Sequence, residues 1–211
     1  MIEIIAFAPW KFLKDGGPFM VPLVLCSLTA VAFIIERCWA LQRKKIISED
    51  IAQRIDRLKP GSDATELAAL CAKDDSMLGR LAHVAFEHAK YSKEENTEAI
   101  QARGRHEATM LERGLVIIEI IAYIAPLLGL LGTVSGLSHI FAEIGFENVA
   151  SQHVRFAKGI SEILNATIMG LTIAVPSYVA FSYYSRKIEM MVIEVETICA
   201  ELVAKLYRQP E

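Results

Sequence analysis

The stretch of sequence that decides the fold is residues 120–142, which read IIAYIAPLLGLLGTVSGLSHIFA. None of these 23 residues is Asp, Glu, Lys or Arg. Two further runs without these four residue types cover residues 16–35 and 163–185. A helix needs roughly 20 mostly apolar residues to cross a bilayer, so the sequence predicts an all-α protein with three membrane-spanning helices.

Composition alone hides this pattern, because 53% of the 211 residues are hydrophobic and 22% are charged, which is close to an ordinary globular protein. The clustering of apolar residues excludes a simple soluble enzyme, a secreted disulfide domain and a disordered chain. The net charge of −3, without a basic stripe, disfavours nucleic-acid binding. Cys26, Cys38, Cys71 and Cys199 lack the spacing of a disulfide framework or zinc site, so we expect reduced thiols and no metal or other cofactor.

The distribution of Lys and Arg predicts the orientation in the membrane. Fourteen of the 22 lie between the first and second spans, against two in the loop between the second and third. The positive-inside rule therefore places the N-terminus outside and the C-terminus inside. The predicted segments are an interfacial amphipathic helix over 1–16, a first span over 17–36, an inner helical domain over 37–92, a long helix over 93–142 containing the second span (117–142), a short outer loop over 143–160, and a long helix over 161–208 containing the third span (163–185).

The inner extensions of the second and third spans are predicted to be long helices. Ser92 and Glu95 form a capping-box pattern. No strong breaker follows before residue 142, and Gly104 and Gly114 each weaken a helix by only about 1 kcal/mol. Two long helices that project inward favour an oligomeric bundle over a lone subunit.

Small residues in the spans predict close helix packing. Gly129, Gly132 and Gly136 repeat along the second span, and Gly170 lies in the third. Such residues let membrane helices approach each other. No Lys-Ser/Thr pair follows the glycines, so they are not a phosphate-binding loop.

The second span also carries a polar stripe. Glu112, Glu119, Pro126, Thr133 and Ile140 recur every seven residues, which keeps them near one helix face. Thr133 could simply bond to a carbonyl of its own helix. The alternative is a hydroxyl in mid-membrane that belongs to an ion path, with carboxylates at its inner end.

The third span repeats the arrangement, with Thr167 above Glu189 and Glu196 near one face. The two stripes together predict a polar lane that opposes an ion-carrying partner. The alternative is that these glutamates are solvated or paired with cations at the membrane edge, as charges near helix ends often are.

Five further residues in or next to the spans are candidates for a role there. Glu162 either stays ionised at the outer surface or faces the bundle. His139 suits an interfacial position or a pH-responsive role. Asn165 could form a hydrogen bond between subunits. Pro126 and Pro176 each leave one helix carbonyl unbonded, which membrane helices tolerate when neighbours or water supply a donor.

The spans lack an acid in their middle. None contains Asp, and no carboxylate lies within 120–142 or 163–185. A membrane proton relay normally uses such a group, so a proton-conducting complex would need the titrating carboxylate from another chain.

The sequence resembles the ExbB/TolQ/MotA family of bacterial inner-membrane proton channels and motors, most closely its ExbB branch. The motifs that carry the resemblance are GGPFMVP at 16–22, APLLGLLGTVSG at 125–136, GISE at 159–162, AT at 166–167, GL at 170–171 and AVP at 174–176. Asn165 departs from the apolar residue expected there.

The resemblance implies a multi-pass protein of the bacterial inner membrane with a periplasmic N-terminus and a cytoplasmic C-terminus. It also implies a homo-pentameric ring around an ExbD-like single-span partner that carries the titrating Asp, coupled to a TonB-like protein that energises outer-membrane transport. Thr133 and Thr167 would line the pore. A TolQ-like role in envelope integrity and a non-conducting membrane scaffold are the alternatives. An enzyme is disfavoured, since no nucleophile and base converge in a motif.

Overall fold

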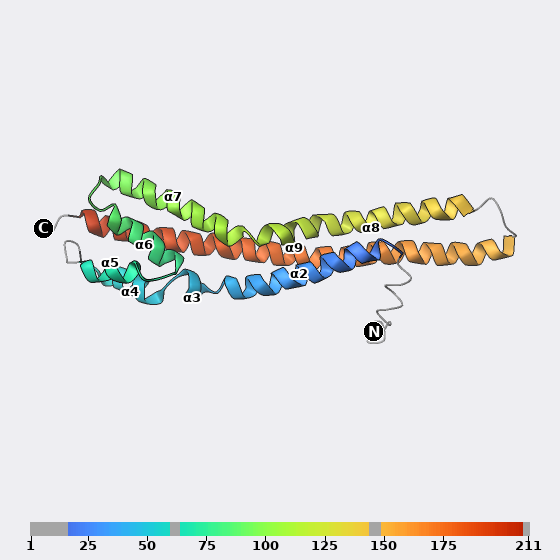
Figure 1. Ribbon diagram of the computed structural model, residues 1–211, viewed down its shortest axis with the longest axis horizontal. Helices are drawn as coiled ribbons and strands as arrows, with labels where there is room; N and C mark the ends of the chain where they lie inside the picture. Colours follow the sequence, from blue (N-terminus) through green and yellow to red (C-terminus); the bar gives the residue numbers. More distant parts are fainter. Residues whose placement is uncertain (1–16, 60–63, 144–148, 209–211) are drawn as a thin grey trace. The chain divides into compact units, whose positions relative to one another are not determined.

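The computed structural model describes residues 17–59, 64–143 and 149–208, and every regular element in these ranges is a helix (Figure 1). This confirms the predicted all-α architecture. The interfacial helix predicted over 1–16 lies outside the described residues. The helices are α2 (Met20–Ala40), α3 (Arg43–Ile46), α4 (Glu49–Arg57), α5 (Thr65–Cys71), α6 (Met77–Glu87), α7 (Lys93–Glu112), α8 (Leu115–Glu143) and α9 (Val149–Tyr207).

Three helical stretches are long and apolar enough to cross a membrane, namely Met20–Ala40, Leu115–Phe141 and Ile163–Tyr207. They agree with the three spans predicted from the charge-free runs. Pro126 and Pro176 lie inside α8 and α9 without ending either helix, as membrane helices allow. The chain is therefore a membrane protein built on three apolar helices.

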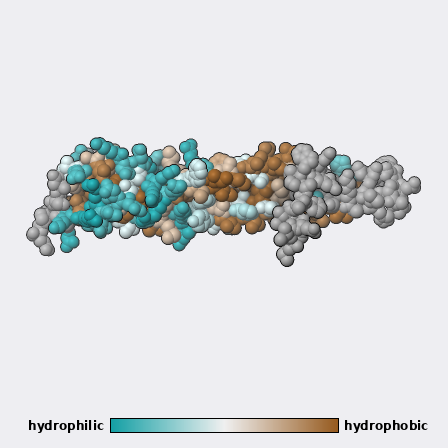
Figure 2. All heavy atoms as spheres, turned by 90° about the horizontal axis from the view of Figure 1, so that it is seen from below, coloured by the Kyte–Doolittle hydropathy of each residue, from teal (hydrophilic) through white to brown (hydrophobic). Residues whose placement is uncertain are grey.

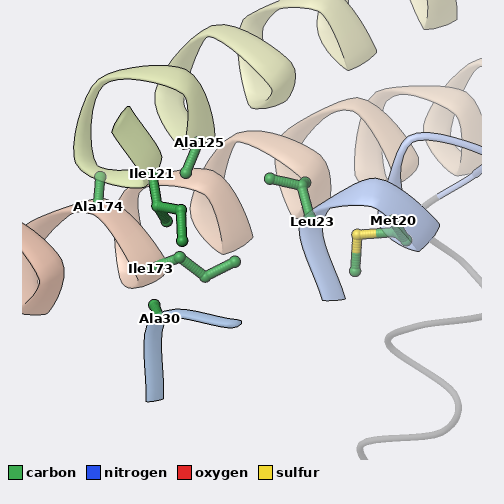
Figure 3. Packing of buried hydrophobic residues seen from close by; sticks show 7 residues of the cluster. All are labelled: Met20, Leu23, Ala30, Ile121, Ala125, Ile173 and Ala174. Atoms are coloured by element: carbon green, nitrogen blue, oxygen red, sulfur yellow. The ribbon is translucent and has the colours of Figure 1, made fainter. Parts of the chain in front are cut away.

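The chain divides into two compact units, the first formed by residues up to 35 together with 116–182. Here α2, α8 and α9 pack around a small apolar core (Figure 3). Its buried members are Met20, Leu23, Ala30, Ile121, Ala125, Ile173 and Ala174. The outer surface of this unit is also apolar, with exposed Leu, Ile and Val side chains on α2, α8 and α9, and Figure 2 shows hydrophobic residues on the side of the molecule that it displays. An apolar exterior is what a helix bundle presents to lipid or to neighbouring subunits.

The second unit comprises residues 36–115 and 183–211. The last part of α9 packs against the short helices there through buried Val195, Cys199 and Leu202. Lys205 Nζ donates to the carbonyls of Ile55 and Asp56, at 2.8 and 2.6 Å, and so satisfies carbonyls at the end of α4. The unit thus joins two segments that are far apart in the sequence.

Tyr207 fixes the connection between α6 and α7 in this second unit. Its hydroxyl lies 2.9 Å from the Tyr91 carbonyl and 3.1 Å from the His88 carbonyl. It also accepts a hydrogen bond from Nδ2 of Asn96, a fully buried side chain that donates to the Ala85 carbonyl as well. These bonds tie the end of α9 to the start of α7.

The predicted start of α7 is confirmed, but the predicted helix over 93–142 is not continuous. Ser92 and Glu95 form a complete capping box. The helix then breaks at residues 113–114, between α7 and α8. Arg37 Nη1 donates to the Leu111 carbonyl at 2.9 Å, and this carbonyl would otherwise accept from the Leu115 amide.

Gly114 makes room for this interaction. A Cβ at Gly114 would lie 2.6 Å from Arg37 Nε, so the guanidinium occupies the space that a side chain would need. Glycine weakens a helix by about 1 kcal/mol, which alone would not end it. The break therefore needs a long-range partner as well as the local sequence.

The loop predicted over 143–160 is also wrong for most of its length, because α9 begins at Val149. The prediction placed the boundary where hydropathy changes. Polar residues such as Ser151, Gln152 and His153 do not end a helix, however, and Gly159 only lowers its stability. The helix therefore extends beyond the apolar run at its N-terminal end.

Candidate functional site

The Thr133 hydroxyl bonds within its own helix. Thr133 lies on α8 and is partly exposed, and its Oγ1 donates to the Leu130 carbonyl at 2.6 Å. This is the local pattern that serine and threonine commonly adopt in helices. In the isolated chain the hydroxyl is accessible but already has an acceptor.

The Thr167 hydroxyl on α9, unlike that of Thr133, does not bond its own helix. Its Oγ1 is enclosed and has no hydrogen-bond partner in the described part of the chain. By contrast, Thr172 and Ser177 on the same helix donate to the Ile168 and Ile173 carbonyls, both at 2.7 Å. A buried hydroxyl without a partner costs about 1–3 kcal/mol. Thr167 is therefore an unsatisfied polar group that calls for an explanation.

Thr167 lies where α8 and α9 approach each other most closely. A Cβ at Gly129 would lie 2.9 Å from the Ala166 carbonyl oxygen and 3.2 Å from the Thr167 Cα. A Cβ at Gly170 would lie 2.6 Å from the Ala125 carbonyl oxygen. Because the obstacles are backbone atoms, larger residues at these two positions would push the helices apart.

The other two glycines of α8 lie along the same contact. A Cβ at Gly132 would be 2.9 Å from Ala166 Cβ, and one at Gly136 would be 2.5 Å from Ile163 Cγ1. Here the obstacles are side chains, and the one at Ile163 can move. The stripe of glycines therefore faces α9, and it encloses the region around Thr167.

The remaining polar residues of the predicted site are spread along the first unit. Asn165 is partly buried and His139 is exposed. His139 borders a hollow of about 530 Å³ together with Phe19, Ser135 and Ser138. The side chain of Glu162 lies outside the described part of the chain. Leu131 and Val134 also border this hollow, which is therefore mainly apolar and lies towards the C-terminal end of α8.

The three predicted carboxylates fall in different units. Glu119 is partly buried in the first unit, whereas Glu189 and Glu196 are exposed in the second. Glu189 accepts a hydrogen bond from Arg186 Nη1 at 2.6 Å. Glu196 borders a hollow of about 500 Å³ with Lys93 and other residues of α7 and α9. Glu189 is therefore paired with a cation, whereas Glu119 and Glu196 have no ion pair among the described residues.

The second unit contains an ionic cluster that the sequence analysis missed. The side chain of Glu107 is only 9% exposed and bonds Arg80 and Arg103, with nearest distances of 2.6 and 2.9 Å. The spacing of four residues between Arg103 and Glu107 signals that pair. Arg80 lies on another helix, so no local pattern could have revealed it.

Buried thiols are the other groups with altered chemistry in this unit. Burial raises the pKa of Cys71 to about 11 and that of Cys199 to about 12. Both thiols therefore stay protonated and unreactive at neutral pH. Among the described residues, no three His, Cys, Asp or Glu side chains come together in a way that could hold a metal ion.

Comparisons with known proteins agree with these features. The profile of the MotA/TolQ/ExbB proton channel family matches residues 73–197. The chain is 30% identical to ExbB-like 1, a biopolymer transport protein of Synechocystis, over 81% of this chain and 68% of that protein. It is 25% identical to the biopolymer transport protein ExbB of Neisseria meningitidis (94% and 96% covered) and 28% identical to the Tol-Pal system protein TolQ of Haemophilus influenzae (94% and 92% covered).

Proposed function

Since this chain belongs to the MotA/TolQ/ExbB proton channel family, we propose that it is the ring subunit of an ExbB-like motor in the bacterial inner membrane. In this proposal five copies surround an ExbD-like single-span protein. The complex uses the proton-motive force to drive a TonB-like protein, which energises outer-membrane transport. The N-terminus is periplasmic and the C-terminus cytoplasmic.

The observation that carries the proposal is the unsatisfied hydroxyl of Thr167. In a medium without water, a polar group needs an internal partner, and in the described part of the chain Thr167 has none. No Asp or Glu lies in the middle of the second and third spans. A hydroxyl whose bonding capacity is unused suits a partner's carboxyl group that alternates between its protonated and ionised forms.

These two observations support the following proposed mechanism. Protons enter from the periplasm and neutralise the Asp of the partner helix beside Thr133 and Thr167. Neutralisation removes a charge from an apolar setting, where charge is costly, and the partner helix can then rotate within the ring. The proton leaves toward Glu119 and Glu189 on the cytoplasmic side.

Proton flux into liposomes tests the proposal. The full chain is reconstituted with its co-purified single-span partner, and flux is measured for wild type, Thr133→Val, Thr167→Val and Thr172→Val. We expect flux to fall at least tenfold in Thr167→Val and to fall in Thr133→Val. Thr172→Val is the matched control, because its hydroxyl already bonds its own helix. Proton flux equal to that of wild type in both Thr133→Val and Thr167→Val would refute the proposal.

A scaffold without ion transport is the second candidate, supported by the internal hydrogen bond of Thr133 and by the glycine contact between α8 and α9. It predicts assembly with partners but no flux above that of empty liposomes. A TolQ-like role is supported by the TolQ of Haemophilus influenzae, which is similar over 94% of this chain. It predicts that deletion of the gene impairs envelope integrity rather than energy-dependent uptake.

A further inference from the structure

A basic hollow lies in the second unit, where the apolar stretch of α9 gives way to charged residues. It measures about 600 Å³ and is bordered by Arg43 of α3 and by Tyr183, Arg186, Lys187, Met190 and Glu194 of α9. The 23 residues before Arg186 contain no Asp, Glu, Lys or Arg. This hollow therefore sits at the depth where the lipid headgroups meet the protein.

The charges around the hollow favour an anion. Arg43, Arg186 and Lys187 contribute three positive charges, and Glu194 is the one acid among the bordering residues. Arg43 hydrogen-bonds Glu194, which together with the nearby Glu49 raises the pKa of the guanidinium and keeps it charged. Arg186 pairs with Glu189, outside the hollow. With Glu49 and Glu189 counted, the charges of the cluster nearly cancel, and Lys187 is the cation that has no ion pair among the described residues, so its ammonium group is the one available to a phosphate group.

The apolar border distinguishes this hollow from a site for a free anion. Tyr183 and Met190 are 62% and 61% exposed, and both border the hollow beside the cationic groups. A soluble phosphate ion would leave these side chains in water. An acyl chain would cover them if the phosphate of the same molecule lay against Arg186 and Lys187.

We propose that this hollow binds one anionic glycerophospholipid of the cytoplasmic leaflet, with the phosphate held by Arg43, Arg186 and Lys187 and an acyl chain lying on Tyr183 and Met190. Basic pockets at the cytoplasmic ends of membrane helices recognise such headgroups. This site rests on the proposed orientation of α9, with its C-terminal end in the cytoplasm, but not on proton conduction. It can therefore be tested separately from the proposed motor function.

The test uses the full chain purified in detergent and native mass spectrometry of bound lipid. Dioleoyl phosphatidylglycerol is titrated against dioleoyl phosphatidylcholine for wild type, for Arg186→Gln/Lys187→Gln and for Lys44→Gln/Lys45→Gln. The second double variant removes the same charge from exposed residues next to Arg43 that do not border the hollow. Circular dichroism checks that both variants are folded.

We expect wild type to retain phosphatidylglycerol over phosphatidylcholine. The hollow variant should lose affinity by about fivefold for each charge removed, whereas the Lys44/Lys45 variant should change by less than twofold. Equal losses in both variants would mean diffuse attraction to a basic surface and would overturn the site. So would equal retention of the two lipids, or displacement of the lipid by millimolar inorganic phosphate. A change in subunit number without a change in bound lipid would show that a second copy fills the hollow instead.

Discussion

Replacing Thr167 by Val should stabilise the isolated protein while it stops the proposed motor. Val has nearly the shape of Thr, so the substitution removes the hydroxyl and leaves the contact between α8 and α9 intact. The Oγ1 atom is enclosed and has no partner in the described structure. Removing such a group recovers its desolvation cost, so the free energy of unfolding should rise by about 1–3 kcal/mol.

The assay is reversible unfolding of the chain without its partner, in mixed micelles titrated with sodium dodecyl sulfate and followed by circular dichroism. Thr172→Val is the matched control, since it makes the same change five residues further along α9. Its hydroxyl donates to the Ile168 carbonyl at 2.7 Å and is exposed. Losing that bond should change the free energy of unfolding by less than about 1 kcal/mol.

A lower free energy of unfolding for Thr167→Val would refute this reasoning, because it would mean that the hydroxyl has a good partner in the chain or in a second copy. The partner complex supplies a second check. If the hydroxyl serves the partner's carboxyl group, the same variant should weaken retention of the partner during purification. Gains in both stability and retention would contradict the proposed role.

Three other changes have expected outcomes. Gly170→Ala forces a methyl against a backbone carbonyl and should lower the free energy of unfolding by about 1–3 kcal/mol. Gly104→Ala, whose added Cβ would lie 3.5 Å from Leu81 Cδ2, should raise it by up to about 1 kcal/mol in the same detergent titration. Burial alone would raise the pKa of Asp74, but hydrogen bonds from Ser76 and Ser48 and the charge of Arg80 together lower that pKa; stability from Asp74 is therefore present above about pH 4 and lost as the pH falls further, and Asp74→Asn should be less stable than wild type at pH 7, with a difference that shrinks as the pH falls below about 4. The pKa of Cys199, raised to about 12 by burial, predicts that maleimide at pH 7.5 leaves this thiol unlabelled until the protein unfolds, and labelling of the native protein at a rate typical of exposed thiols would contradict that burial.

The three membrane helices could be predicted because their signal is local. Each charge-free run is long enough to cross a bilayer, and residues 120–142 show this without reference to the rest of the chain. The capping box of Ser92 and Glu95 is local too. Such features depend on residues within one or two helical turns of each other, so they can be predicted from the sequence without knowledge of the tertiary contacts.

The break between α7 and α8 could not be predicted in the same way. Gly114 is visible in the sequence, but a glycine in a helix is usually tolerated. The Leu111 carbonyl accepts a hydrogen bond from Arg37, which lies 74 residues away in the sequence. A hydrogen bond between residues so far apart leaves no local pattern in the sequence.

The sequence could predict which helix faces carry the polar residues of the candidate site, but not the hydrogen bonds that these residues form. Helical periodicity puts Thr133 and Thr167 on comparable faces of their helices. It cannot say that one hydroxyl bonds its own helix while the other has no acceptor, because that depends on helix packing and on the rotamer of each side chain. The basic hollow was missed because Arg43 and Arg186 are far apart in sequence.

The division of the second unit between residues 36–115 and 183–211 has a consequence for biosynthesis. A ribosome that adds about 5–20 residues per second needs roughly 3–13 s for the intervening residues 116–182. During that delay the second unit has the α6 residues Leu78, Leu81 and Ala85 but still lacks Val195 and Leu202 of α9, all of which are buried in the finished protein. The nascent chain therefore holds an unfinished second unit while residues 116–182 are being made. Chaperone demand in the cell should be greatest in this interval.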